Sequence, residues 1–394
     1  MAQNLLRRWL PHCESIDVWG INFSGWPHEL PYRIYPAGYG DWCSRTQLQA
    51  FVDRAAAGNY THLWILQDLA PLCQYGFPAA LAELRRKKGL RIVHYMPVDA
   101  PLDPAWLEIV RAVDVPVAYT EYGVTQIAAA AHFDGAEPPV CHILPHGVDT
   151  DVYHPLQDRG ALREKWFGEW VKPTDTLLLN VNANQPRKGH VNTLQIVAEL
   201  KRLGVPVKLL MHMPNENSMT SGHSLTSMAY QLGLDPEDWS STDQTATQLK
   251  GKGLFWAKNH PLAGEPLLNE LYNCADLLIS TTLGEGWGFS LTEALAAGCP
   301  VAAPSHTSCQ EIARDLAVLG MSGRFCLLPY SSSAVMSVGD TRVRYPVDVS
   351  FAVRPIEAYL LHLHFSCRAP LTPEVRRWLS WDRIALAWIK LFRG

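Results

Sequence analysis

The chain has 394 residues, of which 47% are hydrophobic and 18% charged, and its formal net charge is −4. This composition is ordinary for a globular protein, and the length suffices for two domains with separate cores. It argues against long disordered stretches, and the net charge provides no general attraction to nucleic acid.

The amino-terminal segment and the cysteines favour a cytoplasmic protein. Residues 1–10 lack the apolar core and cleavage site of a secretory signal, and no run reaches the roughly 18 apolar residues of a membrane-spanning helix. The nine cysteines are odd in number and include no Cys-x-x-Cys pair, which fits reduced thiols. We therefore expect a cytoplasmic location.

The first part of the chain alternates short apolar runs with helical or polar segments. Such alternation predicts a parallel sheet with helices on its faces, and hence a doubly wound α/β domain. The predicted strands are 16–21, 62–66, 91–95 and 115–119, and the helices between them include 44–58 and 79–88.

A second alternating series predicts a second doubly wound domain. Ligands of such sheets bind beyond the carboxyl ends of the strands, so we expect the loops 182–188 and 283–289 to share one rim. The predicted strands are 176–181, 207–212, 253–257, 277–280 and 300–303, with helices such as 191–203 and 265–274 between them.

A glycine-rich turn at 284–288 leads from a predicted strand into a predicted helix at 291–297. Ser290 and Glu293 have the spacing of a capping box, and the alanines that follow favour a helix. The first turn of such a helix carries unpaired N–H groups and the positive end of the helix dipole, which suit a phosphate group. The segment therefore predicts an anion site.

Two glutamates, Glu285 and Glu293, belong to this segment. One lies in the turn and the other one turn inside the predicted helix, so their carboxylates are placed to accept hydrogen bonds from different parts of one elongated ligand. Sugar and ribose hydroxyls are natural donors, which suggests a sugar-nucleotide site. The plainer alternative is that Glu293 caps its own helix and Glu285 is solvated.

Three segments resemble the retaining GT-B glycosyltransferases of family 4. Residues 285–301 are similar to the family signature, in which two glutamates eight positions apart precede Ala-Leu-Ala-Ala-Gly-Cys-Pro-Val. Residues 145–155 look like the segment that leads from the family's first domain to its second, and residues 177–189 are similar to its strand and basic loop. The three motifs occur in the family's order.

The resemblance implies a GT-B architecture of two Rossmann-like domains with a cleft between them. It implies an acceptor domain over residues 1–155, completed by a C-terminal helix at 378–394, and a nucleotide-sugar donor domain over 156–377. The implied activity is the transfer of a hexose from a UDP- or GDP-sugar to a hydroxyl acceptor with retention of configuration. No metal or other cofactor is expected.

The resemblance also implies roles for individual residues of the donor domain. Lys188 and Arg187 are expected to stabilise the leaving diphosphate, Glu285 to bind the transferred sugar, and Glu293 to bind the ribose. Backbone amides of the glycine-rich turn are expected to bind phosphate. The remaining donor-side candidates are Asn182, Ala183, Gly286, Trp287, Gly288 and Phe289.

Ala183 departs from the family pattern. The family usually has an arginine five residues before the loop lysine, and counting back from Lys188 reaches Ala183. A missing cation beside a leaving diphosphate costs a few kcal/mol of transition-state stabilisation. A catalytically weakened relative that only binds nucleotide sugars is therefore an alternative.

The first domain supplies further candidates at strand ends. Gly25 lies in the loop 22–28, which is expected to close on the phosphates, and His94 is a candidate catalytic residue, although a lone histidine at a strand end is often structural. Asp99 and Tyr119 are candidates for the acceptor side.

Two motifs that superficially suit a metal are discounted. Asp149 and Asp151 form an Asp-x-Asp, but they lie in the segment that joins the domains. His362 and His364 are surrounded by residues typical of a packed helix. We therefore predict no metal site.

The acceptor remains open at this stage. A lipid or cell-envelope sugar, a small metabolite and a hydroxymethylated base in DNA all offer a hydroxyl, and the last requires a flipped base and a basic rim. The basic run 85–88 with Arg91 is a candidate contact for an anionic partner, but cations also suit the C-terminus of a helix.

Overall fold

The structure, a computed structural model, divides the chain into two compact units. Unit 1 comprises Met1–Gly147 and Trp381–Gly394, and unit 2 comprises Val148–Ser380; the sequence analysis placed the changes of domain at 155 and 378. The residues that the structure describes are 1–21, 23, 25–37, 43–213, 224–241, 264–336, 342–363 and 371–393. The predicted strand 253–257 lies outside them.

Unit 1 contains a parallel four-stranded sheet in the order β3-β4-β5-β6. Its central strand β4 is buried at five of six positions, as expected for a strand covered on both faces. The strands are β3 (His62–Leu66), β4 (Arg91–Met96), β5 (Val115–Ala118) and β6 (His142–Ile143). Three of these four were predicted within one residue at each end.

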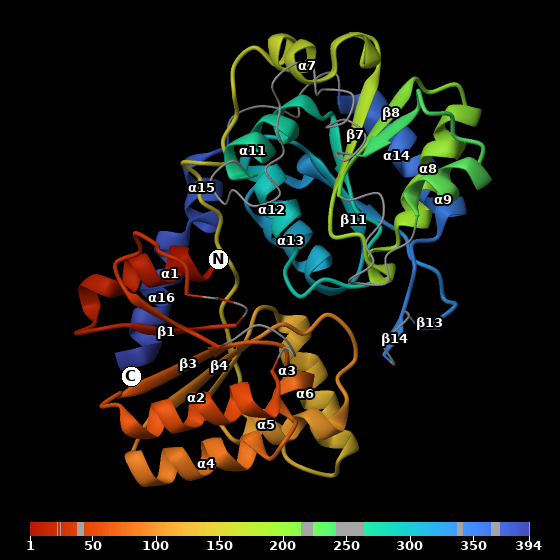
Figure 1. The fold of residues 1–394 in the computed structure, drawn as a ribbon. Helices are drawn as coiled ribbons and strands as arrows, with labels where there is room; N and C mark the ends of the chain where they lie inside the picture. The colour runs from red at the N-terminus through yellow and green to blue at the C-terminus, as the bar shows by residue number, and fades with distance from the viewer. Residues whose placement is uncertain are drawn as a thin grey trace. The chain divides into compact units, whose positions relative to one another are not determined.

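Helices cover both faces of this sheet (Figure 1). Leu63 and Ile65 of β3 belong to the apolar core that they share with α2 (Arg45–Ala57) and α4 (Phe77–Lys88). Trp64 points the other way, because side chains alternate along a strand, and its ring lies 5.1 Å from Trp9 and 5.9 Å from Trp388. The remaining helices of the unit are α1 (Ala2–Trp9), α3 (Leu69–Leu72), α5 (Leu107–Arg111), α6 (Glu121–Phe133) and α16 (Trp381–Arg393).

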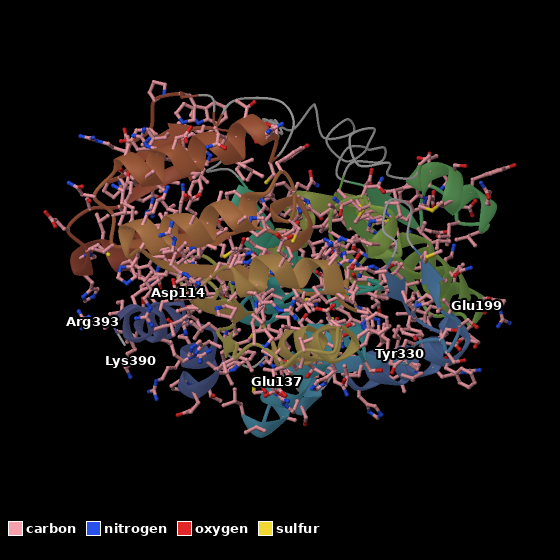
Figure 2. The ribbon with its side chains drawn as sticks, turned by 90° about the horizontal axis from the view of Figure 1, so that it is seen from below. Asp114, Glu137, Glu199, Tyr330, Lys390 and Arg393 are labelled. Atoms are coloured by element: carbon pink, nitrogen blue, oxygen red, sulfur yellow. The ribbon has the colours of Figure 1, made fainter. Side chains whose placement is uncertain are left out.

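The last helix, α16, belongs to unit 1, although the residues that directly precede it, Val148–Ser380, form unit 2. Figure 2 shows Lys390 and Arg393 of this helix at the periphery. The basic run 85–88 forms the last turn of α4, which ends at Gly89 with φ 65°. Cations at a helix C-terminus interact favourably with the helix dipole, so the end of α4 accounts for this run without an anionic partner.

The first predicted strand is shorter than expected and has an unexpected partner. It is β1 (Asp17–Gly20), which pairs in parallel with β2 (Arg33–Pro36) in a two-stranded sheet. We did not predict β2, because its four residues include an arginine and a proline and lack a clear apolar alternation.

Unit 2 is built on a six-stranded parallel sheet in the order β12-β11-β10-β7-β8-β9. The two strands β7 (Thr176–Val181) and β8 (Val207–His212) have the predicted bounds. Predicted to within one residue are β10 (Leu277–Ile279) and β11 (Val301–Pro304), whereas β9 (Trp239–Ser241) and β12 (Phe325–Leu328) were not predicted.

The helices of unit 2 lie on both faces of its sheet, with α8, α9 and α14 on one side and α11, α12 and α13 on the other (Figure 1). Leu178, Leu209 and Ile279 from three strands share an apolar core with residues of α8 and α14. The helices are α7 (Arg159–Phe167), α8 (His190–Arg202), α9 (Leu225–Gln231), α11 (Gly264–Cys274), α12 (Phe289–Ala296), α13 (Thr307–Val318), α14 (Val349–Leu363) and α15 (Pro373–Leu379). A small antiparallel pair joins β13 (Val335–Met336) and β14 (Val343–Arg344).

Among the described residues, no helix combines the length and the apolar character needed to cross a membrane.

Candidate functional site

The two strands β7 and β10 are neighbours in the centre of the sheet of unit 2. From β7 the chain adds β8 and β9 outward on one side, whereas from β10 it adds β11 and β12 on the other. The loops after β7 and β10 therefore leave side by side at the point where the strand order reverses, which is where doubly wound sheets bind ligands. These are the loops 182–188 and 283–289 that the sequence analysis singled out.

Hydrogen bonds hold the two loops together. The amide of Leu283 donates to the carbonyl oxygen of Arg187 at 2.8 Å, and the Arg187 guanidinium donates to the carbonyl of Gly284 at 3.3 Å. The hydroxyl of Thr281 donates to the carbonyl of Gly189 at 2.7 Å. The first of these bonds joins main chain to main chain, whereas the side chains of Arg187 and Thr281 donate the other two, so backbone and side chains together fix the spacing of the loops.

Glycine is required at two places in these loops. Gly189 has φ +63°, and a Cβ atom there would lie 2.3 Å from the carbonyl oxygen of Thr281. Gly288, which precedes α12, has φ +90°, and its Cβ would lie 2.8 Å from Cδ1 of Leu291. Only glycine adopts such conformations without strain, so these residues allow the close approach of the loops and the abrupt start of α12.

Lys188 and Glu285 form a buried ion pair between the loops. Only 9% of the lysine side chain and 10% of the glutamate side chain are exposed. The sequence analysis expects both residues to contact a ligand, and the structure brings them together within unit 2. Two charges are costly to desolvate and contribute little net stability as a buried pair. Stability alone therefore does not explain why both charged residues are found here.

The helix that follows the turn begins earlier than predicted. Its N-cap is Gly288, and no side chain forms a capping hydrogen bond. The prediction of a capping box from Ser290 and Glu293 is therefore wrong: the left-handed glycine starts the helix two residues sooner, which puts Ser290 inside the first turn. A helix start without a side-chain cap remains suited to an anion.

Glu293 instead points its carboxylate at a tyrosine of the neighbouring helix. The hydroxyl of Tyr272 donates to Oε2 of Glu293 at 2.9 Å, and Tyr153 also forms a side-chain hydrogen bond with this carboxyl. Burial raises the pKa of Glu293 to about 7, although the hydrogen bond from Tyr272 lowers it and the nearby charge of Glu265 raises it. Near neutral pH this carboxyl therefore exists in both protonation states.

The loop after β7 is held by polar side chains. The side-chain amide of Asn182 donates to Oδ1 of Asn180 at 2.9 Å, and the side-chain amide of Asn180 in turn donates to the hydroxyl of Thr193 at 3.0 Å. Ala183 is exposed, and its carbonyl accepts a hydrogen bond of 2.9 Å from Nε2 of His190. The backbone at position 183 is thus anchored while its side chain faces outward.

The other donor-side candidates lie in the turn between β10 and α12. Trp287 is buried with 6% exposure, whereas Gly286 and Phe289 are partly buried. Phe289 is the first residue of α12. Their contacts with a donor stay a prediction.

His94 lies in the interior of unit 1. Its ring is fully buried, Nε2 donates to the carbonyl of Gln67 at 3.0 Å, and Nδ1 has no hydrogen-bond partner among the described residues. Burial lowers the pKa of His94 to about 4, while the hydrogen bond to Gln67 raises it. The ring is thus neutral at physiological pH, and a catalytic role for it stays a prediction.

The three other candidates of unit 1 differ in exposure. Gly25 is exposed and has φ +89°, whereas its neighbours at 22 and 24 lie outside the described residues. Asp99 is partly buried just after β4. Tyr119 is buried, with its ring 4.1 Å from that of His146, and burial raises its pKa well above the ordinary value.

Sequence reasoning missed the residues that hold the two glutamates. Thr307 accepts a hydrogen bond of 3.2 Å from the amide of Glu285, and Tyr272 and Tyr153 contact Glu293. The position of Thr307, just beyond the strand next to β10, was a usable signal. The tyrosines gave none, because tertiary packing decides which side of α11, with Tyr272, and which part of the segment before α7, with Tyr153, meets α12.

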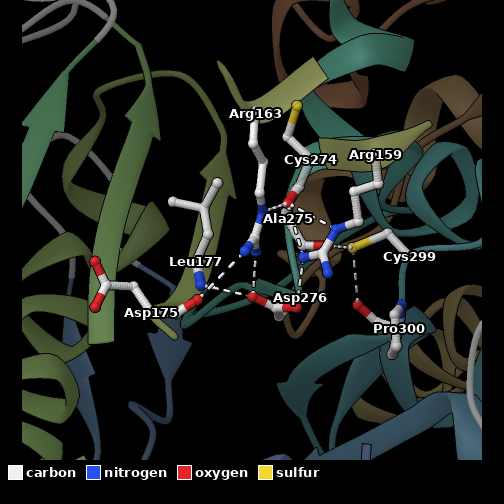
Figure 3. A network of polar contacts seen from close by, with 9 residues as sticks. All are labelled: Arg159, Arg163, Asp175, Leu177, Cys274, Ala275, Asp276, Cys299 and Pro300. Carbon is white, nitrogen blue, oxygen red and sulfur yellow. Dashed lines mark hydrogen bonds and ion pairs between the residues drawn. The ribbon is translucent and has the colours of Figure 1, made fainter. Parts of the chain in front are cut away.

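A network of charges joins β7 and β10 at their amino ends (Figure 3). The carboxylate of Asp276 pairs with the guanidiniums of Arg159 and Arg163 and accepts the amide of Leu177 at 2.7 Å. Both arginines also donate to the carbonyl of Cys274. Because this network lies at the strand ends opposite to the loops, it aligns the two strands that carry them without entering the site.

The described residues contain no group of three or more His, Cys, Asp or Glu side chains that could hold a metal ion. In the Asp-x-Asp segment, Oδ1 of Asp149 accepts the amide of Asp151 at 3.2 Å, so this aspartate organises a turn. His364 lies outside the described residues.

Comparison with known proteins finds sequence similarity to two glycosyltransferases over part of the chain. No protein-family model matches it. It is 27% identical over 181 residues to a D-inositol 3-phosphate glycosyltransferase of Segniliparus rotundus, which is 45% of this chain and 35% of that protein. It is 28% identical over 217 residues to the protein of the same name from a Nocardioides species, which is 53% of this chain and 42% of that protein. The similarity spans less than half of these relatives.

Solved structures resemble the chain over more of its length. A sucrose-phosphate synthase from Thermosynechococcus elongatus has a TM-score of 0.70 at 16% identity, covering 100% of this chain and 92% of that one. A glycosyltransferase from Rickettsia africae has a TM-score of 0.63 at 10% identity, covering 92% and 84%. An Anabaena protein solved with UDP and glucose has a TM-score of 0.57 at 12% identity, covering 93% and 86%.

At these identities the structural likeness concerns the fold, and the curated relatives supply the sequence similarity. The predicted α/β class with parallel sheets is confirmed. The chain therefore has the GT-B fold, and over about half of its length it is similar in sequence to two D-inositol 3-phosphate glycosyltransferases.

Proposed function

We propose that the protein is a glycosyltransferase that moves a sugar from a nucleotide-diphosphate sugar to a hydroxyl acceptor. The observation that carries this proposal is the meeting of Lys188 and Glu285 on two hydrogen-bonded loops at the strand-order reversal of unit 2. The names of the curated relatives and the UDP and glucose found with a protein of similar fold support it.

In this proposal the diphosphate binds at the start of α12 and beside the loop cations. Without a ligand, Glu285 neutralises the ammonium of Lys188. An ammonium has three donors, so it can contact a diphosphate oxygen while it keeps or exchanges its contact with the carboxylate. Lys188 and Arg187 then stabilise the charge that develops on the leaving diphosphate, and Glu285 accepts hydrogen bonds from the transferred sugar.

We propose the finer features of the reaction by resemblance to the family. They are transfer of a hexose from a UDP- or GDP-sugar, retention of configuration, and independence of metal, with Lys188 and Arg187 neutralising charge in place of a divalent ion. The ribose binds Glu293, whose carboxyl accepts hydrogen bonds when ionised. Acceptor contacts are assigned to Asp99 and Tyr119, and catalytic and phosphate contacts in unit 1 to His94 and Gly25.

A second candidate is a relative that binds nucleotide sugars without turnover. The observation in its favour is Ala183, whose exposed methyl group stands where the family usually has an arginine. Lys188 and Arg187 are then the cations of the loop that remain for the diphosphate. Binding of UDP-glucose without any release or transfer of glucose would identify this case.

Two measurements test the proposed function. Thermal shift with UDP, GDP, ADP and the corresponding glucose conjugates should raise the melting temperature with at least one of them, because a ligand bound only by the folded state stabilises it. Labelled sugar from that donor is then offered to lipid extract, free sugars and duplex DNA. Absence of any shift and of any transfer or hydrolysis would contradict the proposal.

A further inference from the structure

Thr307, the first residue of α13, has a backbone conformation that its side chain disfavours. Its φ is +52°. The structure describes four non-glycine residues with positive φ, namely Cys43, Tyr75, Asp158 and Thr307, and the threonine is the one whose side chain branches at Cβ. Residues that branch at Cβ rarely adopt this region, so the backbone of Thr307 is strained.

The surroundings hold Thr307 in place. The ring of His306 lies with Nε2 3.1 Å from the carbonyl oxygen of Tyr345, and the amide of Ser305 donates to the carbonyl of Leu328 at 2.9 Å. On the helical side, Ile312 of α13 is buried. Strained residues persist where their neighbours determine them in this way, and they concentrate at functional sites.

The hydroxyl of Thr307 reaches the loop that carries Glu285. Its Oγ1 accepts the Glu285 amide at 3.2 Å and lies 3.4 Å from Nδ1 of His306. Both Thr307 and Glu285 are buried, at 7% and 8% exposure. Glu285 is thus held at two points, with its main chain bound to Thr307 and its carboxylate paired with Lys188.

We infer that Thr307 is a positioning residue for Glu285. Glycine adopts the left-handed conformation without strain, so the backbone alone would favour glycine at position 307. What glycine lacks is the hydroxyl that fixes the Glu285 amide and, through it, the carboxylate that faces the ligand. This inference rests on the proposed function, in which Glu285 binds the transferred sugar.

Three variants separate the hydroxyl from the backbone. Thr307→Val keeps the size and branching of the side chain but removes the acceptor, Thr307→Ser keeps the hydroxyl, and Thr307→Gly relieves the backbone without supplying a hydroxyl. Hydrogen exchange of the Glu285 amide, measured by mass spectrometry on peptides within 283–289, reports on the positioning without any ligand. Titrations with UDP and with UDP-glucose report on the site.

The expected pattern follows the hydroxyl. Exchange at Glu285 accelerates about tenfold or more in the Val and Gly variants and stays as in the wild type in the Ser variant, since a lost hydrogen bond is worth about a factor of ten. UDP affinity changes less than about twofold, whereas UDP-glucose affinity falls about tenfold in the Val and Gly variants and is restored in the Ser variant. The Gly variant melts no lower than the Val variant.

Two results would overturn the inference. One is wild-type exchange of the Glu285 amide in the Val variant. The other is a loss of UDP-glucose binding that follows the melting temperatures of the variants instead of the presence of the hydroxyl. If the wild type binds neither UDP nor UDP-glucose, the proposed function fails, and the exchange comparison still decides whether Thr307 positions Glu285.

Discussion

The hydroxyl of Tyr272 on α11 donates a hydrogen bond of 2.9 Å to Oε2 of Glu293 on α12. This contact helps to keep a carboxylate in a buried place, since a hydrogen bond to the charged form favours it. Burial nevertheless outweighs it and raises the pKa of Glu293 to about 7. The residue therefore links protonation both to the stability of unit 2 and to the proposed binding of a ribose.

Stability should fall as pH rises from about 4.5 to about 7. The folded chain holds the proton of Glu293 up to a pKa of about 7, whereas the unfolded chain releases it near the ordinary value of 4.5. The contribution is therefore complete below pH 4.5 and lost as pH passes through 7, with a span of about 3 kcal/mol. Urea unfolding of Glu293→Gln should lack this slope, and the exposed Glu164→Gln should keep it. An equal slope in both variants would contradict the assignment.

Binding of UDP-glucose should strengthen as pH rises through about 7. A ribose diol donates hydrogen bonds, and the ionised carboxylate of Glu293 is the better acceptor. UDP-glucose suits this test because each of its two phosphates is substituted at two oxygens. Neither phosphate therefore has a second proton that titrates near neutral pH. Calorimetric titrations at pH 6 and pH 8 should differ for the wild type and agree for Glu293→Gln. Equal affinities of the wild type at both pH values would remove Glu293 from the ribose site.

Breaking the pair of Lys188 and Glu285 one partner at a time should destabilise the protein more than removing both. Each single substitution to Met leaves one buried charge without its partner, which costs about 3–5 kcal/mol, whereas the double variant leaves none. The exposed pair of Lys87 and Glu83 is the control, and its coupling should be much weaker because solvent screens both charges. Double-mutant cycles from urea unfolding measure both couplings, and similar values would show that the buried pair is not special.

Gly189→Ala should be more damaging than Gly204→Ala. Both glycines have positive φ, but a Cβ at Gly189 meets the carbonyl oxygen of Thr281 at 2.3 Å, whereas a Cβ at Gly204 meets nothing within 4 Å. The control variant should lose about 1–2 kcal/mol from its backbone alone. The Gly189 variant should lose more than that, because the loops must also separate. Equal losses in urea unfolding would mean that the contact is easily relieved.

Asp276→Asn should weaken unit 2 and remove part of its sensitivity to acid. Burial raises the pKa of Asp276, but Arg159 and Arg163 outweigh burial and hold that pKa below its ordinary value. The stabilisation is therefore present above the ordinary pKa and is lost as pH falls through the lowered one. The variant should lose about 3 kcal/mol at pH 7, because two arginines lose their counter-ion. The exposed Asp151→Asn should unfold like the wild type, and a matching loss there would refute the special role.

The sequence predicted the parts of the fold whose signal is local. Strands such as β7 and β8 are mostly apolar, and their bounds were predicted correctly. The short strands β2, β9 and β12 have three or four residues each, so their pairing depends on the sheet edge that tertiary structure offers. The two alternating series of strands and helices predicted two doubly wound domains.

The site was predicted as a set of loops but not as a set of contacts. The order of the strands explains why loops distant in sequence meet, so Lys188 and Glu285 could be expected on one rim. Their direct pairing, the turn of Glu293 toward Tyr272 and the strained backbone of Thr307 depend on side-chain packing between elements. The predicted capping box was wrong for a related reason, because the spacing of residues does not predict the left-handed conformation of Gly288.

The hydrogen bonds that join the two loops have a consequence for protein engineering. The side chains of Arg187 and Thr281 donate two of these bonds and must be kept, whereas the methyl group of Ala183 donates none. Position 183 is the most suitable for substitution, because its methyl group faces solvent while the side chain of His190 holds its carbonyl by a hydrogen bond. A single substitution of Ala183 by arginine can therefore supply the missing cation without a change to the rest of the loop.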